Sequence, residues 1–117
     1  KVRALLRRDF DQVFDPQGKY QLDALLTPTT PTTAFPIGAI YGDSVLMQYA
    51  DQFTVSANHA GIPGISLPGG IAADGLPIGV QFLGPDYSEE TLLQIGRALE
   101  IGTQDEAWRA LKPAVLR

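Results

Sequence analysis

The sequence predicts an α/β fold, and three observations indicate this class. An amphipathic segment opens the chain, a glycine-rich region with period-two alternation lies in its middle, and a second amphipathic segment follows. Helical periodicity interleaved with short strand-like runs is typical of α/β proteins. The length of 117 residues suits one unit, so residues 1–117 are expected to form a single domain or a single part of one.

The first predicted helix covers residues 1–14. Its apolar side chains recur on one face at helical spacing, at Val2, Leu6, Phe10, Val13 and Phe14. No capping residue precedes it, and Lys1 and Arg3 place positive charge where the helix dipole favours negative charge. We therefore expect this helix to continue upstream in a longer chain; a frayed terminus is the alternative.

The next stretch alternates between short elements and loops. Residues 22–26 are apolar enough for a short buried strand, whereas the threonine- and proline-rich residues 27–38 predict an extended loop, because proline lacks an amide donor. Residues 42–61 predict a helix in two pieces, with Asp43 or Ser44 as its cap and Gly61 as its end.

The region from residue 61 to residue 84 is the most strand-like. Its apolar residues alternate with Gly79 and Gln81, as in a strand with one covered face, and Asp74-Gly75 predicts a turn between adjacent antiparallel strands. Residues 88–102 then predict a second helix, capped by Ser88 and ending before Gly102. Trp108 and Leu111 are compatible with a last helical turn.

Composition excludes several kinds of site. The chain has no cysteine, which removes a thiol nucleophile, a disulfide framework and a cysteine-bound metal. Its one histidine, His59, excludes a multi-histidine zinc site within this chain, so no metal site is expected. The net charge of −4 argues against a nucleic-acid surface over the whole chain. No apolar run reaches the roughly 18 residues of a membrane span, so a cytoplasmic location is expected.

The residues alone do not assemble a complete active site. His59 is compatible with a general base, but a lone histidine near a helix end is more often packed or exposed. The basic residues Lys1, Arg3, Arg7 and Arg8 could contact phosphate, although such a cluster usually faces water. Arg7 can pair weakly with Asp11, four residues on. These patterns indicate a piece of an α/β enzyme or a binding module.

Three blocks of sequence carry a resemblance to a known family. LDALLTPTTPTTAF (22–35), DQFTVSANHAGIPGISLPGG (51–70) and GLPIGVQFLGPDYSEETLLQIGRALE (75–100) resemble, in this order, the C-terminal part of amidase-signature enzymes. Within that family they most resemble the branch that hydrolyses glutamine for glutamyl-tRNA(Gln) amidotransferases. The resemblance implies the C-terminal portion of an amidase domain, with strands of a mixed sheet flanked by helices.

The resemblance also implies a chemistry. Such enzymes cleave amides with a Ser–cis-Ser–Lys triad, which lies in their N-terminal part, so no catalytic residue is expected in this chain. In the amidotransferase branch, ammonia from glutamine passes to partner subunits. The implied partners are the B and C subunits, with tRNA reached through the complex and no membrane. ATP and Mg²⁺ would serve a partner subunit, and no cofactor is expected in this chain.

One residue is assigned to substrate by the resemblance. An aspartate just before the FTVPANLAG-like stretch looks like the partner of the glutamine ammonium group in this family, and Asp51 occupies that position. The arginine for the substrate carboxylate would lie upstream of residue 1. Asp51 could instead, or in addition, cap a helix that starts near Phe53. Two positions depart from the family pattern, with Ser56 in place of proline and His59 in place of leucine.

Three functions are therefore open at this point. The chain can be a segment of a glutamine-dependent tRNA amidotransferase subunit, a segment of a stand-alone amidase with another amide substrate, or a non-catalytic binding domain. Asp51 favours the first over the second, because a neutral amide does not need an anion there.

Overall fold

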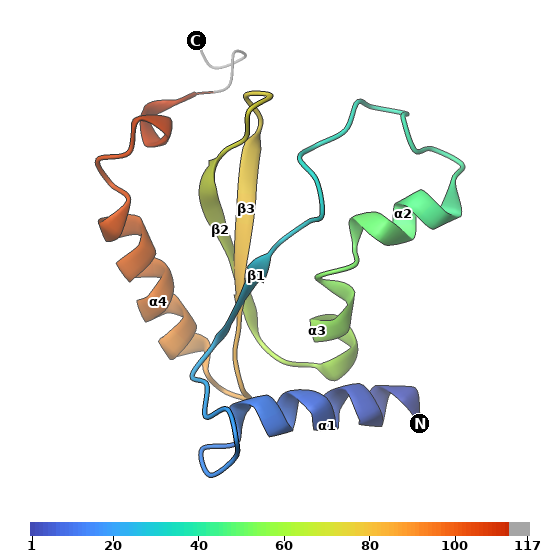
Figure 1. Cartoon of the computed structure of the whole chain (residues 1–117), viewed down its shortest axis with the longest axis vertical. Helices are drawn as coiled ribbons and strands as arrows, with labels where there is room; N and C mark the ends of the chain where they lie inside the picture. The colour runs from blue at the N-terminus through green and yellow to red at the C-terminus, as the bar shows by residue number, and fades with distance from the viewer. Residues whose placement is uncertain (113–117) are drawn as a thin grey trace.

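The computed structural model describes residues 1–112 and confirms the α/β class. Helix α1 is followed by strand β1, helices α2 and α3, a pair of strands, helix α4 and a 3₁₀ turn (Figure 1). Their bounds are α1 Val2–Phe14, β1 Leu25–Pro28, α2 Ser44–Ala50, α3 Val55–Ala60, β2 Gly64–Ile71, β3 Pro77–Leu83, α4 Glu89–Gly102 and η1 Ala107–Ala110.

The three described strands form an antiparallel sheet in the order β1-β3-β2. The predicted hairpin between β2 and β3 is confirmed. Ala72 donates its amide to the carbonyl oxygen of Leu76 across the turn at 2.9 Å, and Asp74 Oδ1 accepts the amide of Leu76 at 3.0 Å. Gly75 adopts φ +81°, a conformation that glycine reaches without steric cost.

The two sides of the sheet differ in what lies beside them. Helix α4 lies on one side and helices α2 and α3 lie on the other (Figure 1). Gly96 lets α4 approach β2 closely, since a Cβ atom there would stand 3.2 Å from Leu67 and 3.3 Å from Ile65. On the opposite face, the register aligns Thr27, Gln81 and Ser66 in one row across the three strands.

Two strand predictions need correction. The first strand was expected at residues 22–26, but β1 begins at Leu25 and continues to Pro28, because its pairing with β3 sets its limits. Leu26 is 58% exposed, so this strand is not buried. Pro28 is tolerated because β1 is an edge strand. The alternation in β3 placed Gln81 on an uncovered face, whereas its side chain is 5% exposed.

The helical predictions are largely confirmed. Residues 42–61 form two helices, with Asp43 Oδ1 accepting the amides of Val45 and Leu46 at the start of α2. Gly61 ends α3 in the left-handed conformation. At α4 the details differ, since Gly102 is the last helical residue and Ser88 precedes the helix without a side-chain capping bond. Trp108 lies in η1, which is the expected last turn in 3₁₀ form.

Helix α1 is tied to the end of α3 by two arginines. Arg3 Nε donates to the carbonyl oxygen of His59 at 2.7 Å, and Arg7 Nη1 donates to that of Ala60 at 3.3 Å. These carbonyls lack partners within α3, so the guanidinium groups satisfy them. Arg7 also pairs with Asp11 as predicted, and with Asp86. The expectation that this basic cluster faces water holds for Arg3, which is exposed although its Nε is bonded, and needs correction for Arg7, which is half-buried.

The Arg7–Asp86 pair predicts an acid-sensitive contact. Its hydrogen bond from Arg7 lowers the pKa of the Asp86 carboxyl below 3.8. Because the folded-state pKa is depressed, the stabilising contribution is complete above 3.8 and is lost as pH falls through the lower folded-state value. In urea unfolding of the 117-residue chain, Asp86→Asn should lower the midpoint at neutral pH. The difference from wild type should vanish in strong acid; a difference that is constant with pH would contradict the pairing.

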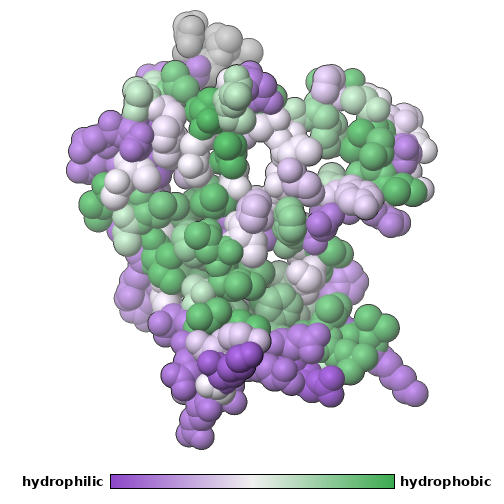
Figure 2. Space-filling model, in the orientation of Figure 1, coloured by the Kyte–Doolittle hydropathy of each residue, from purple (hydrophilic) through white to green (hydrophobic). Residues whose placement is uncertain are grey.

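The described chain exposes much apolar surface. Its accessible surface is 8653 Å², whereas a compact monomer of 12.6 kDa exposes about 6,200 Å². Figure 2 shows hydrophobic surface over the region of α2. Exposed apolar side chains on α2 and the loop before it are Phe35, Ile37, Tyr41, Val45, Leu46, Met47 and Tyr49. This face of the molecule has no covering layer among residues 1–112.

Candidate functional site

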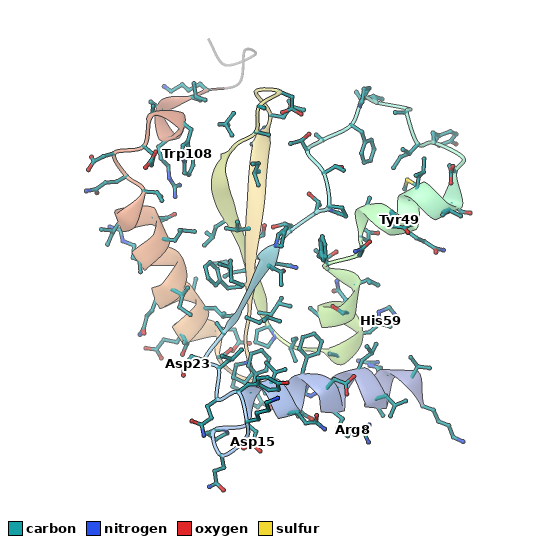
Figure 3. The ribbon with its side chains drawn as sticks, in the orientation of Figure 1. Arg8, Asp15, Asp23, Tyr49, His59 and Trp108 are labelled. Atoms are coloured by element: carbon teal, nitrogen blue, oxygen red, sulfur yellow. The ribbon has the colours of Figure 1, made fainter. Side chains whose placement is uncertain are left out.

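Asp51 lies in the short turn between α2 and α3, on the wall of an open cavity of about 580 Å³. Its side chain is exposed, and it forms no hydrogen bond or ion pair with any other residue in 1–112. Figure 3 labels Tyr49 on α2, beside this turn. Asp51 contributes the one charged side chain to the cavity, whose other lining residues are Val45, Gln48, Tyr49, Gln52 and Val55.

The backbone of Asp51 organises the turn. Its carbonyl oxygen accepts the amides of Thr54 at 3.0 Å and Val55 at 2.9 Å, and its own amide donates to the carbonyl oxygen of Gln48 at 3.3 Å. The residue that precedes α3 is Thr54, and no side chain caps that helix. The alternative that the Asp51 carboxylate caps α3 is therefore wrong. Because the turn is held by backbone groups, the carboxylate remains available to a ligand.

Gln81 supports this turn from the sheet, although no sequence pattern marks it as a site residue. Its Nε2 donates to the carbonyl oxygen of Phe53 at 2.7 Å and to Thr27 Oγ1 at 2.8 Å, and the carbonyl oxygen of Pro28, 3.3 Å away, shares one of these two protons. A weaker signal was present in the sequence, since Gln81 is a polar residue inside the apolar run from Ile78 to Leu83.

Threonines hold the proline-rich loop onto the sheet. Thr29 Oγ1 and Ser66 Oγ lie 2.8 Å apart, and Thr33 Oγ1 donates to Asp74 Oδ2 at 2.8 Å. The amide of Leu76 and the hydroxyl of Thr33 lower the pKa of Asp74, so this carboxylate stays charged. The loop between β1 and α2 is thus fastened at its start to β2 and, further on, to the hairpin turn.

His59 takes no part in the Asp51 cavity. Its Nδ1 lies 2.8 Å from the carbonyl oxygen of Val55 on the same helix, and because a carbonyl only accepts, Nδ1 carries the proton. Figure 3 labels the residue on α3. The ring is bonded within its own helix and is absent from the cavity wall, so the structure gives no support for His59 as a general base.

The part of the chain that the structure describes has no cluster of side chains placed to bind a metal ion. Residues 1–112 hold no group of three or more histidine or carboxylate side chains placed to bind a metal ion. None of the helices within residues 1–112 has the length and apolar character needed to cross a membrane.

Comparison with known proteins identifies relatives of this chain. The A subunit of the glutamyl-tRNA(Gln) amidotransferase from Xanthobacter autotrophicus is 52% identical over 101 residues, which cover 86% of this chain and 20% of the relative. The crystal structure of the corresponding A subunit from Thermotoga maritima matches with a TM-score of 0.75 and 40% identity, over 85% of this chain and 20% of that one. The crystal structure of the peptide amidase of Stenotrophomonas maltophilia matches with a TM-score of 0.56 and 34% identity. This match covers 96% of this chain and 21% of the amidase.

The extent of these matches defines what is shared. This chain spans about a fifth of the length of the curated relatives it matches. The family model named Amidase matches residues 1–93, which include α1, the whole described sheet and the Asp51 turn. With a fold that solved amidases share and a family match over most of its length, the chain belongs to the amidase family.

Proposed function

We propose that this chain is the C-terminal segment of the glutamine amidohydrolase subunit of a glutamyl-tRNA(Gln) amidotransferase. That subunit would release ammonia from glutamine for the amidation of glutamate on tRNA(Gln). Curated relatives that bear the amidotransferase name are 46–52% identical to this chain. Among the solved structures, the amidotransferase A subunit is 40% identical to this chain, whereas the cyclic-dimer hydrolase and the peptide amidase are 33% and 34% identical. The higher identity supports the amidotransferase branch.

The observation that carries the proposal is the Asp51 carboxylate on its cavity wall. It is the sole charged lining residue, and its charge is not compensated by another residue in 1–112. A substrate with an ammonium group would supply the missing positive charge through a charge-assisted hydrogen bond. Glutamine carries such a group, whereas a simple neutral amide does not. The cation for the glutamine carboxylate would come from outside this chain.

The exposed apolar face supports the view that the chain forms part of a larger fold. The accessible surface of the chain exceeds that of a compact monomer of the same mass by roughly 2,400 Å². Exposed patches of this kind mark surfaces that another layer of protein covers. The remaining four-fifths of an amidase domain would supply this layer together with the Ser–cis-Ser–Lys triad. The nucleophile and its lysine would therefore lie outside residues 1–117.

The enzyme would act within a larger complex. The B and C subunits of the amidotransferase would be the protein partners, with tRNA contacted through the complex in the cytoplasm. ATP and Mg²⁺ would act in a partner subunit, and this chain would hold no cofactor. Its own contribution would be to bind and orient the amino-acid end of glutamine.

A stand-alone amidase is the second candidate. Its support is the pair of departures from the family pattern, Ser56 and His59, and the likeness to solved hydrolases of other amides. Both residues lie on α3, next to the Asp51 turn. The two candidates differ in one testable property, because only the glutamine enzyme needs a substrate with an ammonium group.

A graft tests the proposed function. Residues 1–117 would replace the matching segment of the Thermotoga maritima relative, and this grafted enzyme would be assayed for ammonia release. We expect release from glutamine, and markedly less from glutaramate, which lacks the α-amino group, and from a simple aliphatic amide. Preference for a neutral amide over glutamine would favour the stand-alone amidase. A folded graft without any amidase activity would favour a binding domain.

The isolated 117-residue chain should be inactive. Because no triad is expected in it, purified chain mixed with glutamine should release no more ammonia than buffer does. A coupled glutamate dehydrogenase assay measures the release. Turnover that follows the chain through successive purification steps would show that a nucleophile resides within these residues.

A further inference from the structure

We propose that Gln81 is a positioning residue that holds the Asp51 turn against the sheet and thereby sets the affinity for the ammonium group of the substrate. This inference rests on the proposed function for the identity of the substrate. The placement of the turn by Gln81 rests on geometry alone, and it can be tested separately.

The Gln81 amide joins three parts of the chain. It extends from the central strand β3 to Phe53 in the α2–α3 turn, and to Thr27 and Pro28 on the edge strand β1. Phe53 lies two residues after Asp51, and the backbone between them is fixed by the bonds to the Asp51 carbonyl. A displacement of Phe53 would therefore move the carboxylate.

The chemistry of the site fixes the orientation of the Gln81 amide. Two of its three partners are backbone carbonyl oxygens, which only accept hydrogen bonds, so the NH₂ end must face them. The side chain is 5% exposed, and water therefore has little access to replace the amide. Removing the NH₂ group would leave the carbonyl of Phe53 without its side-chain donor, whereas the carbonyl of Pro28 would keep the hydroxyl of Thr27 as a donor.

Few other contacts join the turn directly to the sheet. Among the described residues, the bond from Gln81 to Phe53 is the one side-chain hydrogen bond that joins residues 44–54 to the sheet. Helix α2 makes no extensive contact with any strand in residues 1–112. The position of Asp51 relative to the sheet therefore depends strongly on a single buried amide.

The test is a double-mutant cycle in the grafted enzyme. Gln81→Leu removes the donor at similar volume, and Asp51→Asn removes the charge. We expect Gln81→Leu to raise the KM for glutamine about tenfold, a size typical of the coupling between residues in one hydrogen-bond network. The KM for glutaramate should change much less. In the Asp51→Asn background, the same change at Gln81 should leave KM for glutamine nearly unaltered. Gln94→Leu, on the exposed face of α4, is the matched control.

A second pair of variants guards against misfolding. Thr27→Val deletes one acceptor with nearly no change of shape, and Gln81→Asn keeps the amide on a shorter stem. Each should raise KM for glutamine less than Gln81→Leu does, with unchanged KM for glutaramate. The proposal would be overturned if Gln81→Leu raised the KM for glutamine and the KM for glutaramate equally. It would also be overturned if the effects of Gln81→Leu and Asp51→Asn on the KM for glutamine were additive, because Gln81 would then be a general structural residue.

Hydrogen exchange separates this inference from the proposed function. In Gln81→Leu, the amides of Thr54 and Val55 should exchange faster, with the amides of α4 unchanged. If Asp51→Asn has no effect on glutamine while this local loss of protection occurs, the proposed function fails and the placement of the turn by Gln81 stands. Unchanged exchange at Thr54 and Val55 in Gln81→Leu would overturn the placement, whatever the kinetics.

Discussion

Replacing Asp51 by asparagine should raise the KM for glutamine about 30-fold in the grafted enzyme, which corresponds to about 2 kcal/mol. The reason is the loss of the carboxylate that is expected to meet the substrate ammonium group. We take the lower end of the range for charge pairs because Asp51 is exposed in the described structure. Steady-state ammonia release over a series of glutamine concentrations measures the change.

A matched control lies at the other end of the same helix. Asp43→Asn removes one negative charge before α2, and asparagine caps a helix about as well as aspartate. This variant should keep the KM for glutamine close to wild type. If both variants raise KM equally, a general change in the field near α2 explains the effect, and Asp51 has no specific role. Unchanged kinetics in Asp51→Asn would remove the residue from the substrate site.

Leu92→Ala should destabilise the 117-residue chain by about 2–5 kcal/mol, the range for truncating a buried leucine. Leu92 is 2% exposed and packs where α4 begins, next to Gly84. Its core neighbours are few, since the other buried apolar side chains described are Phe14, Ala57, Ala60 and Leu83. A loss of this size is a large part of the stability of a small domain.

Leu93 provides the control for this substitution. It is the next residue on the same helix and is 63% exposed, so Leu93→Ala makes the same chemical change without opening a cavity. Its urea midpoint should stay near that of wild type, while the midpoint of Leu92→Ala falls. Equal midpoints for the two variants would mean that α4 does not pack on the sheet as described.

Local signals in the sequence predict the helices well. Asp43 before α2 and Gly61 after α3 act through backbone geometry within a few residues, and each does in the structure what its residue type indicates. The Asp74-Gly75 turn is predictable for the same reason. In contrast, the limits of β1 depend on its pairing with β3, which is more than 50 residues away, and no local pattern fixes that pairing.

The candidate site is predictable only in part. The family resemblance predicts Asp51 as a site residue, but it does not predict Gln81, which supports the turn that carries Asp51. In the sequence, Gln81 is typical of the polar face of an alternating strand. Its burial depends on Phe53 and Thr27, which are next to it only in the folded chain. Likewise, the sequence predicts that Arg3 and Arg7 belong to a solvated basic face of their helix. It does not predict their bonds, because the carbonyl groups that they bind belong to a helix that is distant in sequence.

The most direct measurement of the central claim is the ratio of affinities for glutamine and glutaramate, which differ in one ammonium group. Competition binding to the grafted enzyme gives this ratio for wild type and for Asp51→Asn. We predict that wild type prefers glutamine by roughly 30-fold, and that the preference falls to about onefold in the variant. Equal affinity of wild type for the two ligands, or an unchanged preference in Asp51→Asn, would contradict the assignment of Asp51 to the substrate ammonium group.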